Sequence, residues 1–285
     1  MIKNRAVSVK TKKMLCCFLN ETVLVFTTIL ILIPIYYFAI GAFKHRLDIV
    51  KFPLQINATL FTFKNFAYAL DKMKYLQAVR NTFLIFIISQ TLIVVFGSIA
   101  GFAIARIPRK LFSIVYAILL ALMVVPFIGC IIPLVVQSVT LRIYNTLWAC
   151  ILVQTAWNLP FAVFLYTGFM RRLPLDLEYA AYIDGCSVFK LYHKIFFPLL
   201  SPVTAACLIR CGTGIWNDYV LSNSVLNSAK TPTLMVGIKL FFGSRTTEYG
   251  YAFAGIMCTC FPIIIAFVAL QKNFIKGLTA GSVKE

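Results

Sequence analysis

The sequence predicts an all-α membrane protein with six transmembrane helices. Only 13% of its 285 residues are charged and 61% are hydrophobic, whereas about a quarter of the residues of a soluble domain are charged. The hydrophobic residues gather in stretches that reach the roughly 20 residues a membrane-spanning helix needs. A five-helix alternative stays open, because polar residues interrupt the fourth stretch and it could be a re-entrant segment. The six stretches are 22–43, 81–105, 111–136, 146–169, 195–224 and 249–271.

The first apolar stretch follows a basic N-terminal segment, residues 1–21. A secretory signal peptide also begins with basic residues, but its apolar core is only about 7–15 residues long. The run at 22–43 is longer than that, and no small-residue cleavage site precedes Phe43-Lys44. We therefore interpret 22–43 as a retained transmembrane helix.

The distribution of Lys and Arg predicts that both termini are cytoplasmic. With the N-terminus inside, the inward-facing segments hold more Lys and Arg than the outward-facing ones, and they are shorter. Cytoplasmic loops of membrane proteins carry such an excess. The net charge of +18 suits an anionic membrane surface and needs no nucleic acid to explain it.

Outside the apolar stretches the sequence offers no further domain. The longest such segment, 44–80, would be extracytoplasmic, and its run at 66–76 is typical of an interfacial amphipathic helix. The chain has no Gly-rich nucleotide-binding loop, no nucleophile with a base and no paired carboxylates. We expect a protein that is not an enzyme and binds no cofactor.

The nine cysteines predict packing rather than a metal site. Most lie inside the apolar stretches, where a cysteine usually behaves as a small apolar residue. No Cys-x-x-Cys or Cys/His ligand spacing occurs, and the chain has only two histidines. We expect no metal ion.

A polar segment at 178–198, EYAAYIDGCSVFKLYHKIFFP, lies between two apolar stretches. A charge at the centre of a bilayer costs about 3 kcal/mol, so this segment must face water. With the orientation above, it lies on the cytoplasmic side.

The same segment predicts two short helices. Pro174 suits the first turn of a helix, and Asp176 and Glu178 would complement the helix dipole there. Gly185 would end this helix, and Ser187 would cap a second one. The alternative is an ordinary amphipathic loop that rests on the lipid headgroups.

The segment resembles the EAA loop of ABC importer permeases, which reads roughly EAAxxDG, about nine residues, then IxxP. Outside the loop, Trp216-Asn217-Asp218 resembles the WND element of carbohydrate importers. Residues 271–285, QKNFIKGLTAGSVKE, resemble the tail of the maltose-type second permease. The resemblance extends from about residue 22 to the end. Matching positions in the loop are Ala180, Ala181, Asp184, Gly185, Ile195 and Pro198, and other matches are Asn81-Thr82, Gly97 and Ala105-Arg106.

The resemblance implies a type I ABC importer permease with both termini cytoplasmic, in the bacterial inner (cytoplasmic) membrane. Its core would be 81–271, with five helices and a coupling loop at 171–198, followed by a cytoplasmic tail at 272–285. Such a chain imports a sugar or oligosaccharide and forms half of the translocation pathway. The implied partners are a second permease subunit (as a heterodimer), two cytoplasmic ATPase subunits that hydrolyse ATP, and an extracytoplasmic solute-binding protein.

The resemblance also implies which residues contact the ATPase. One position departs from the family, because Tyr179 stands where the family has Glu directly before the two alanines. Glu178 is one residue earlier and points about 100° away on a helix, so we do not expect it to replace that carboxylate. The implied coupling residues are Glu178, Tyr179, Ala180, Ala181, Asp184, Gly185 and Pro198, and the implied ATPase-contacting tail residues are Gly277, Leu278, Thr279, Ala280 and Gly281.

Polar residues inside the apolar stretches are candidates for the substrate pathway. Arg210 and Asp218 are eight residues apart in the fifth stretch and would share a face, and intramembrane charges normally face a cavity. Alternatively, Trp216 anchors the chain at the membrane interface and Asp218 is solvated. Gln154, Asn158 and Pro160 are expected to break the fourth stretch, and Pro126, Gly129 and Pro133 would permit a kink in the third. The pathway candidates are Gln154, Asn158, Trp216, Asn217 and Asp218.

Three other functions compete with a sugar permease. An ABC permease for another solute, such as glycerol phosphate, phosphate or amino acids, is disfavoured by the WND and GLTAG matches. A secondary transporter or channel would need internal repeats and coupling-ion acids in its helices, and Asp218 is the one such acid. An assembly protein without a transport role would tolerate changes in the polar loop.

Overall fold

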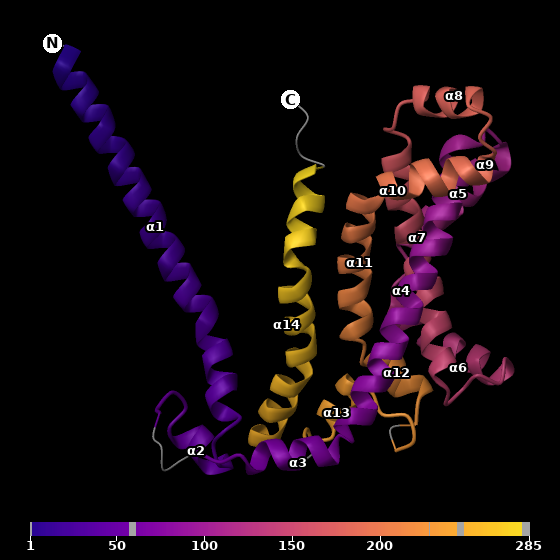
Figure 1. The fold of residues 1–285 in the computed structure, drawn as a ribbon. Helices are drawn as coiled ribbons and strands as arrows, with labels where there is room; N and C mark the ends of the chain where they lie inside the picture. Colours follow the sequence, from indigo (N-terminus) through magenta and orange to yellow (C-terminus); the bar gives the residue numbers. More distant parts are fainter. Residues whose placement is uncertain (1, 57–60, 228, 244–247, 281–285) are drawn as a thin grey trace. The chain divides into compact units, whose positions relative to one another are not determined.

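The computed structural model describes residues 2–56, 61–227, 229–243 and 248–280, and its regular elements there are helices (Figure 1). The chain divides into two compact units, Met1–Asp71 with Phe241–Cys258 and Lys72–Leu240 with Thr259–Glu285. The helices are α1 (Ile2–Gly41), α2 (Arg46–Lys51), α3 (Lys64–Lys72), α4 (Tyr75–Arg106), α5 (Lys110–Leu122), η2 (Phe127–Cys130), α6 (Ile131–Thr140), α7 (Leu147–Met170), α8 (Asp176–Ile183), α9 (Val188–Lys190), η3 (Leu191–Phe196), α10 (Phe197–Leu199), α11 (Ser201–Trp216), α12 (Val220–Val225), α13 (Leu234–Lys239) and α14 (Tyr249–Ala280).

Three helices in the described ranges are long and apolar enough to cross a membrane: Cys17–Gly41 of α1, α4 and α7. Two bent pairs also pass this test, and counting each pair as one span raises the number to five. The first pair is α5 with Phe127–Thr140, bent by 101°, and the second is Val188–Leu199 with α11, bent by 70°. The apolar part of α14 at Tyr249–Ile265 is shorter. The prediction of an all-helical membrane protein is confirmed. The described residues contain three to five candidate spans, whereas the sequence predicted six.

Two predicted breaks have different outcomes. The expected kink in the third stretch is present, because α5 ends at Leu122 and η2 begins only after Pro126. The expected break in the fourth stretch was wrong, since α7 runs without interruption through Pro160. Proline is tolerated inside transmembrane helices because neighbouring groups can satisfy the freed carbonyl.

In the first unit, the chain after α1 is held by a buried amide and a buried lysine. Asn65 Nδ2 donates to the carbonyl oxygens of Ala42 (2.9 Å) and Lys44 (2.8 Å). Lys44 Nζ in turn donates to the carbonyl oxygen of Phe52 at 2.6 Å. Burial lowers the pKa of Lys44, and the nearby carboxylate of Asp48 opposes this effect. These contacts tie the end of α2 and the start of α3 to the chain just after α1.

In the second unit, α4 and α7 lie side by side (Figure 1). Glycines at two positions four apart on α4 permit this close approach. A Cβ added to Gly97 would lie 2.8 Å from Ala162 Cβ, and one added to Gly101 would lie 2.6 Å from Tyr166 Cβ. Small residues at such spacing let transmembrane helices pack backbone to backbone.

Polar side chains of α4 attach the other segments of this unit. Asn81 Nδ2 donates to the carbonyl oxygen of Pro232 at 2.8 Å, and the hydroxyl of Thr82 accepts from the backbone N–H of Leu234, the first residue of α13. Gln90 Nε2 donates to the carbonyl oxygen of Leu208 in α11 at 2.6 Å. One helix therefore supports α7, α11 and α13.

We predict that Gly101→Ala destabilises the second unit. The new methyl group would lie 2.6 Å from Tyr166 Cβ and 3.1 Å from the backbone nitrogen of Thr167, so α4 and α7 must separate. Overpacking of this kind costs about 1–3 kcal/mol. Thermal unfolding of the purified protein in detergent measures the loss. Gly168→Ala is the matched control, because nothing lies within 4 Å of a Cβ at Gly168. Equal melting temperatures for the two variants would contradict the prediction.

Candidate functional site

The first candidate site is the polar loop at 171–198. Its first helix is present, but the prediction that Pro174 lies in its first turn was wrong, because α8 begins at Asp176. α8 carries Asp176 and Glu178 in its first turn, where carboxylates complement the helix dipole. Gly185 has φ +71°, a left-handed conformation that glycine adopts without steric cost. The backbone N–H of Cys186 donates to the carbonyl oxygen of Ala181 at 2.9 Å, which closes the end of α8.

The second helix of the loop is present but irregular. Ser187 caps it, and its hydroxyl accepts a hydrogen bond from the backbone N–H of Lys190 at 3.4 Å. The helix then widens into the π-helical turn η3, returns to α-geometry in α10, and meets α11 at a bend of 70°. π-Turns inside helices are frequent at functional sites. Pro198 lies in α10 on the exposed side.

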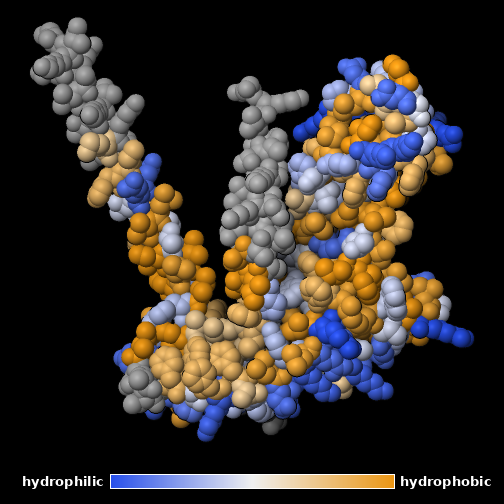
Figure 2. Space-filling model, viewed as in Figure 1, coloured by the Kyte–Doolittle hydropathy of each residue, from blue (hydrophilic) through white to orange (hydrophobic). Residues whose placement is uncertain are grey.

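The two faces of α8 differ in what they contact. Tyr179 is 59% exposed, Tyr182 49% and Ile183 86%, and Ala180, Asp184 and Gly185 are also exposed. The surface over α8–α10 accordingly mixes polar and apolar groups (Figure 2). We call Tyr179, Ala180, Tyr182, Ile183 and Asp184 the outer face of α8.

The inner face of α8 includes two residues that the resemblance assigned to ATPase contact. Ala181 is only 3% exposed and Glu178 only 8%. Both are covered by this chain's own side chains, so they do not offer a surface to another protein. Of the two alanines, only Ala180 is exposed to a partner.

Glu178 meets a cation that sequence reasoning did not connect with it. Its Oε1 lies 2.7 Å from Nε of Arg106, the last residue of α4, and both side chains are almost fully buried. The contact is an ion pair without a well-aligned hydrogen bond between these two atoms. Removing one partner of a buried ion pair typically costs about 3–5 kcal/mol. The sequence had singled out Arg106 through the family match at Ala105-Arg106. That match did not indicate that Arg106 would pair with Glu178, 72 positions later.

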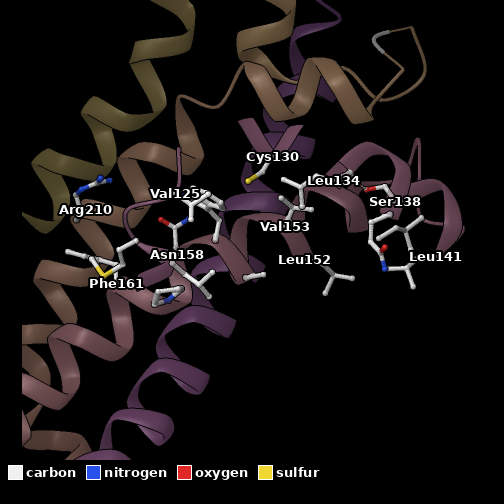
Figure 3. A pocket seen from close by; sticks show the side chains of 17 residues that line it. Val125, Cys130, Leu134, Ser138, Leu141, Leu152, Val153, Asn158, Phe161 and Arg210 are labelled. Atoms are coloured by element: carbon white, nitrogen blue, oxygen red, sulfur yellow. Dashed lines mark hydrogen bonds between the residues drawn. The ribbon is translucent and has the colours of Figure 1, made fainter. Parts of the chain in front are cut away.

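The second candidate site is a cavity of about 470 Å³. Its size is within the range of small-molecule sites. It lies where the bent pair α5–α6 faces α7 and α11 (Figure 3). Arg210 is the one charged residue among those that line it, and its guanidinium carbon lies 5.7 Å from the ring centre of Phe161. The lining residues are Leu122, Met123, Val125, Cys130, Leu134, Gln137, Ser138, Leu141, Ile143, Leu152, Val153, Ala156, Trp157, Asn158, Pro160, Phe161 and Arg210.

Only Asn158 among the predicted pathway residues lines this cavity. Its Nδ2 donates to the carbonyl oxygen of Gln154 at 2.8 Å, so these two residues are neighbours on α7. Trp216 is 6% exposed and packs edge-on against Phe86, so it is neither an interface anchor nor open to a solute. Asn217 is exposed and follows the end of α11.

Asp218 has a structural role instead. α11 ends at Trp216, so Asp218 does not share a helical face with Arg210 and that prediction was wrong. Its carboxylate accepts from the backbone N–H groups of Leu221 (3.1 Å) and Ser222 (2.9 Å) and from the Ser222 hydroxyl (2.7 Å). Aspartate commonly satisfies the free N–H groups at a helix start in this way.

The predicted ATPase-contacting tail lies at the edge of the described chain. Residues 277–280 form the end of α14, and nothing is described of their side chains. Gly281 lies outside the described residues.

Span-length apolar helices, an exposed polar loop between them and a cavity lined by one charged residue are typical of a membrane-embedded transport protein. Comparison with known families is more specific. The family described as the binding-protein-dependent transport system inner membrane component matches residues 93–279, and this chain belongs to that family. The resemblance found in the sequence is thereby confirmed. The family is a transport component and not an enzyme.

Individual relatives agree with the family. The chain is 36% identical over 257 residues to the melibiose/raffinose/stachyose import permease MelC of Bacillus subtilis, which covers 88% of this chain and 91% of MelC. It is 31% identical over 252 residues to AmyC of Thermoanaerobacterium thermosulfurigenes, described as a probable permease for starch degradation products, covering 88% and 91%. The fold matches a chain of a bacterial ABC transporter involved in the import of the acidic polysaccharide alginate, with TM-score 0.74 at 18% identity, covering 90% and 95%.

We predict that Asp218→Ala lowers the stability of the protein without abolishing its transport function. The change frees two backbone N–H groups of α12, and losing such a cap costs about 1–2 kcal/mol. Thermal unfolding in detergent measures the effect, and Ser224→Ala is the control because Ser224 is half-buried and its side chain bonds only within α12, to the carbonyl oxygen of Val220. An unchanged melting temperature with lost transport would instead make Asp218 a pathway residue.

Proposed function

We propose that this chain is one permease subunit of an ABC transporter that imports a sugar or oligosaccharide. The observation that carries the proposal is the outer face of α8, where Tyr179, Tyr182 and Ile183 stand exposed on a short helix of a binding-protein-dependent permease. Several relatives are named for saccharides, among them MelC, AmyC and the arabinooligosaccharide permease AraQ of Bacillus subtilis.

The outer face of α8 would fit a groove of a cytoplasmic ATPase subunit. Exposed aromatic and aliphatic side chains are typical anchors of protein interfaces. Asp184 adds a negative charge to this face, and Gly185 and Pro198 shape the loop around it. In this proposal the aromatic ring and hydroxyl of Tyr179 replace the carboxylate that other family members have there.

The proposed assembly contains a second permease, two ATPase subunits and an extracytoplasmic solute-binding protein. The family description supports a binding protein as partner. The chain would cross the bacterial inner membrane six times with both termini in the cytoplasm, and its segments would be those expected from the sequence. Closure of the ATPase pair would move α8 and switch the pathway between inward-open and outward-open states.

The cavity lined by Asn158 and Arg210 is the best-supported part of a substrate pathway in this chain. An uncompensated charge inside an apolar helix is costly and is a functional-site candidate by default. Trp157 and Phe161 offer aromatic faces, and Gln137, Ser138 and Asn158 offer hydrogen-bonding groups. This mixture suits the alternating apolar and hydroxyl faces of a sugar. A phosphorylated solute is the alternative. Arg210 supports it, because the one charge among the described residues that line the cavity is positive.

We predict that Ile183→Asp prevents stable association with the ATPase. Ile183 is the most exposed of the three large hydrophobic residues of the outer face, and a charge there would be buried without a partner in an apolar groove. Co-purification of the ATPase with the tagged permease measures the loss, which should be at least about tenfold since burying an unpaired charge is costly. Val50→Asp is the control, because Val50 is 71% exposed on the segment that would be extracytoplasmic. Normal ATPase recovery with Ile183→Asp would refute this docking surface.

We also predict that Arg210→Met weakens substrate use. Losing a hydrogen bond from a charged donor costs about 1.5–3 kcal/mol, so the KM for uptake should rise by about tenfold, since each 1.4 kcal/mol is a factor of ten. Arg210→Lys keeps a positive charge, so its KM should rise less than that of Arg210→Met. Uptake into proteoliposomes with the full transporter measures KM. An unchanged KM combined with poor recovery of the second permease would show that Arg210 pairs with that subunit instead.

A further inference from the structure

Arg106 joins three parts of the polar loop at the end of α4. Its Nε faces Glu178 of α8 at 2.7 Å, and its Nη2 donates to the carbonyl oxygen of Leu173 at 3.0 Å. Its guanidinium carbon lies 5.1 Å from the ring centre of Phe196 in η3. The segment before α8, α8 itself and the segment after it therefore all meet one side chain.

Arg106 is the last member of a stripe on α4 that carries the loop. Ser98, Phe102 and Arg106 are four residues apart and so lie on one helical face. The hydroxyls of Ser98 and Tyr192 are 2.7 Å apart, and the rings of Phe102 and Phe196 are 5.3 Å apart. The contacts of Ser98 and Phe102 reach only η3. Of these three residues, only Arg106 makes a polar contact with α8.

α8 has little other support along its length. An open hollow of about 490 Å³ lies beside it, lined by four residues of α8 together with Pro174, Asp184, Cys186 and Ile195. Ala181 provides the remaining buried contact. The buried contacts of α8 are therefore few, and the ion pair of Glu178 with Arg106 is the one that fixes its first turn.

We propose that Arg106 and Glu178 are positioning residues that lock α8 to the end of α4, so that a displacement of α8 moves α4 as part of the same rigid body. This inference rests on the proposed function, because it presumes that an ATPase displaces α8. The two charges attract strongly where they are shielded from water, and the anchor at Leu173 holds Arg106 in place. From α4 the displacement passes to α7 through the contacts of Gly97 and Gly101.

The lock gives Glu178 a role that differs from ATPase contact. Its carboxylate faces its own chain, so its loss would leave the outer face of α8 intact and the ATPase still bound. The lost function would be transmission: ATP would be hydrolysed without the corresponding transport. Substitution of a residue that contacts the ATPase would have a different effect, because the ATPase would no longer bind.

The test uses the full chain assembled with its second permease, ATPase subunits and binding protein in proteoliposomes. Uptake of radiolabelled raffinose and ATP hydrolysis are measured together for wild type, Glu178→Gln, Arg106→Gln and the charge reversal Arg106→Glu with Glu178→Arg. We expect the ratio of raffinose taken up to ATP hydrolysed to fall at least about fivefold in both single variants, with the ATPase still bound. The charge reversal should recover most of the ratio. Arg109→Gln, an exposed arginine three residues further on, is the matched control and should match wild type.

A second measurement does not depend on the transported sugar. Spin labels at Asp176→Cys and Lys110→Cys, both exposed positions, report the distance between α8 and the chain just after α4 by double electron–electron resonance, in a background without other reactive cysteines. We expect a narrow distribution of distances between the two labels in wild type and a broad one in Glu178→Gln. If the variant fails to assemble, the same difference is expected for the permease chain alone in detergent. An unchanged ratio in the assembled single variants, or an unchanged narrow distribution, would overturn the lock. Absence of ATP-driven raffinose uptake in wild type, with distances as expected, would count against raffinose as the transported sugar and would leave the lock supported.

Discussion

The close approach of α4 to α7 is the contact on which the second unit depends. Lipid tails are as apolar as the helices, so burial of apolar surface does not drive helices together in a membrane, and tight packing must do so. Gly97 and Gly101 bring the backbone of α4 onto Ala162 and Tyr166. α4 can then serve as a common support, because its remaining faces bind α11, α13 and the polar loop.

The sequence was sufficient to predict elements whose cause is local. Apolar length predicted the span-length helices, Gly185 predicted the end of α8, and Ser187 predicted the start of the helix after it. Each of these depends on the properties of a few adjacent residues. Turns and caps can therefore be predicted without knowledge of the fold. The motif matches predicted the family.

The errors share a different cause, which is that composition does not show where a side chain points. Asp218 lies near an apolar stretch, yet a short carboxylate next to free N–H groups binds them first, and Asp218 does so at α12. Pro160 was expected to break the fourth helix, but α7 continues through it. The ion pair of Arg106 with Glu178 joins positions far apart in sequence, and only the packing of the loop against α4 brings them together.

Glu178 and Tyr179 show how adjacent residues of one helix can divide two tasks. About 100° separates them around the axis, so Glu178 can be buried while Tyr179 is exposed. Glu178 turns inward to Arg106, where a carboxylate is needed because the cation is shielded from water. Tyr179 turns outward, where an aromatic ring can contribute interface area without a charge to desolvate. A family position that usually holds a carboxylate can thus change to tyrosine without disturbing the inward ion pair, because the two side chains never share an environment.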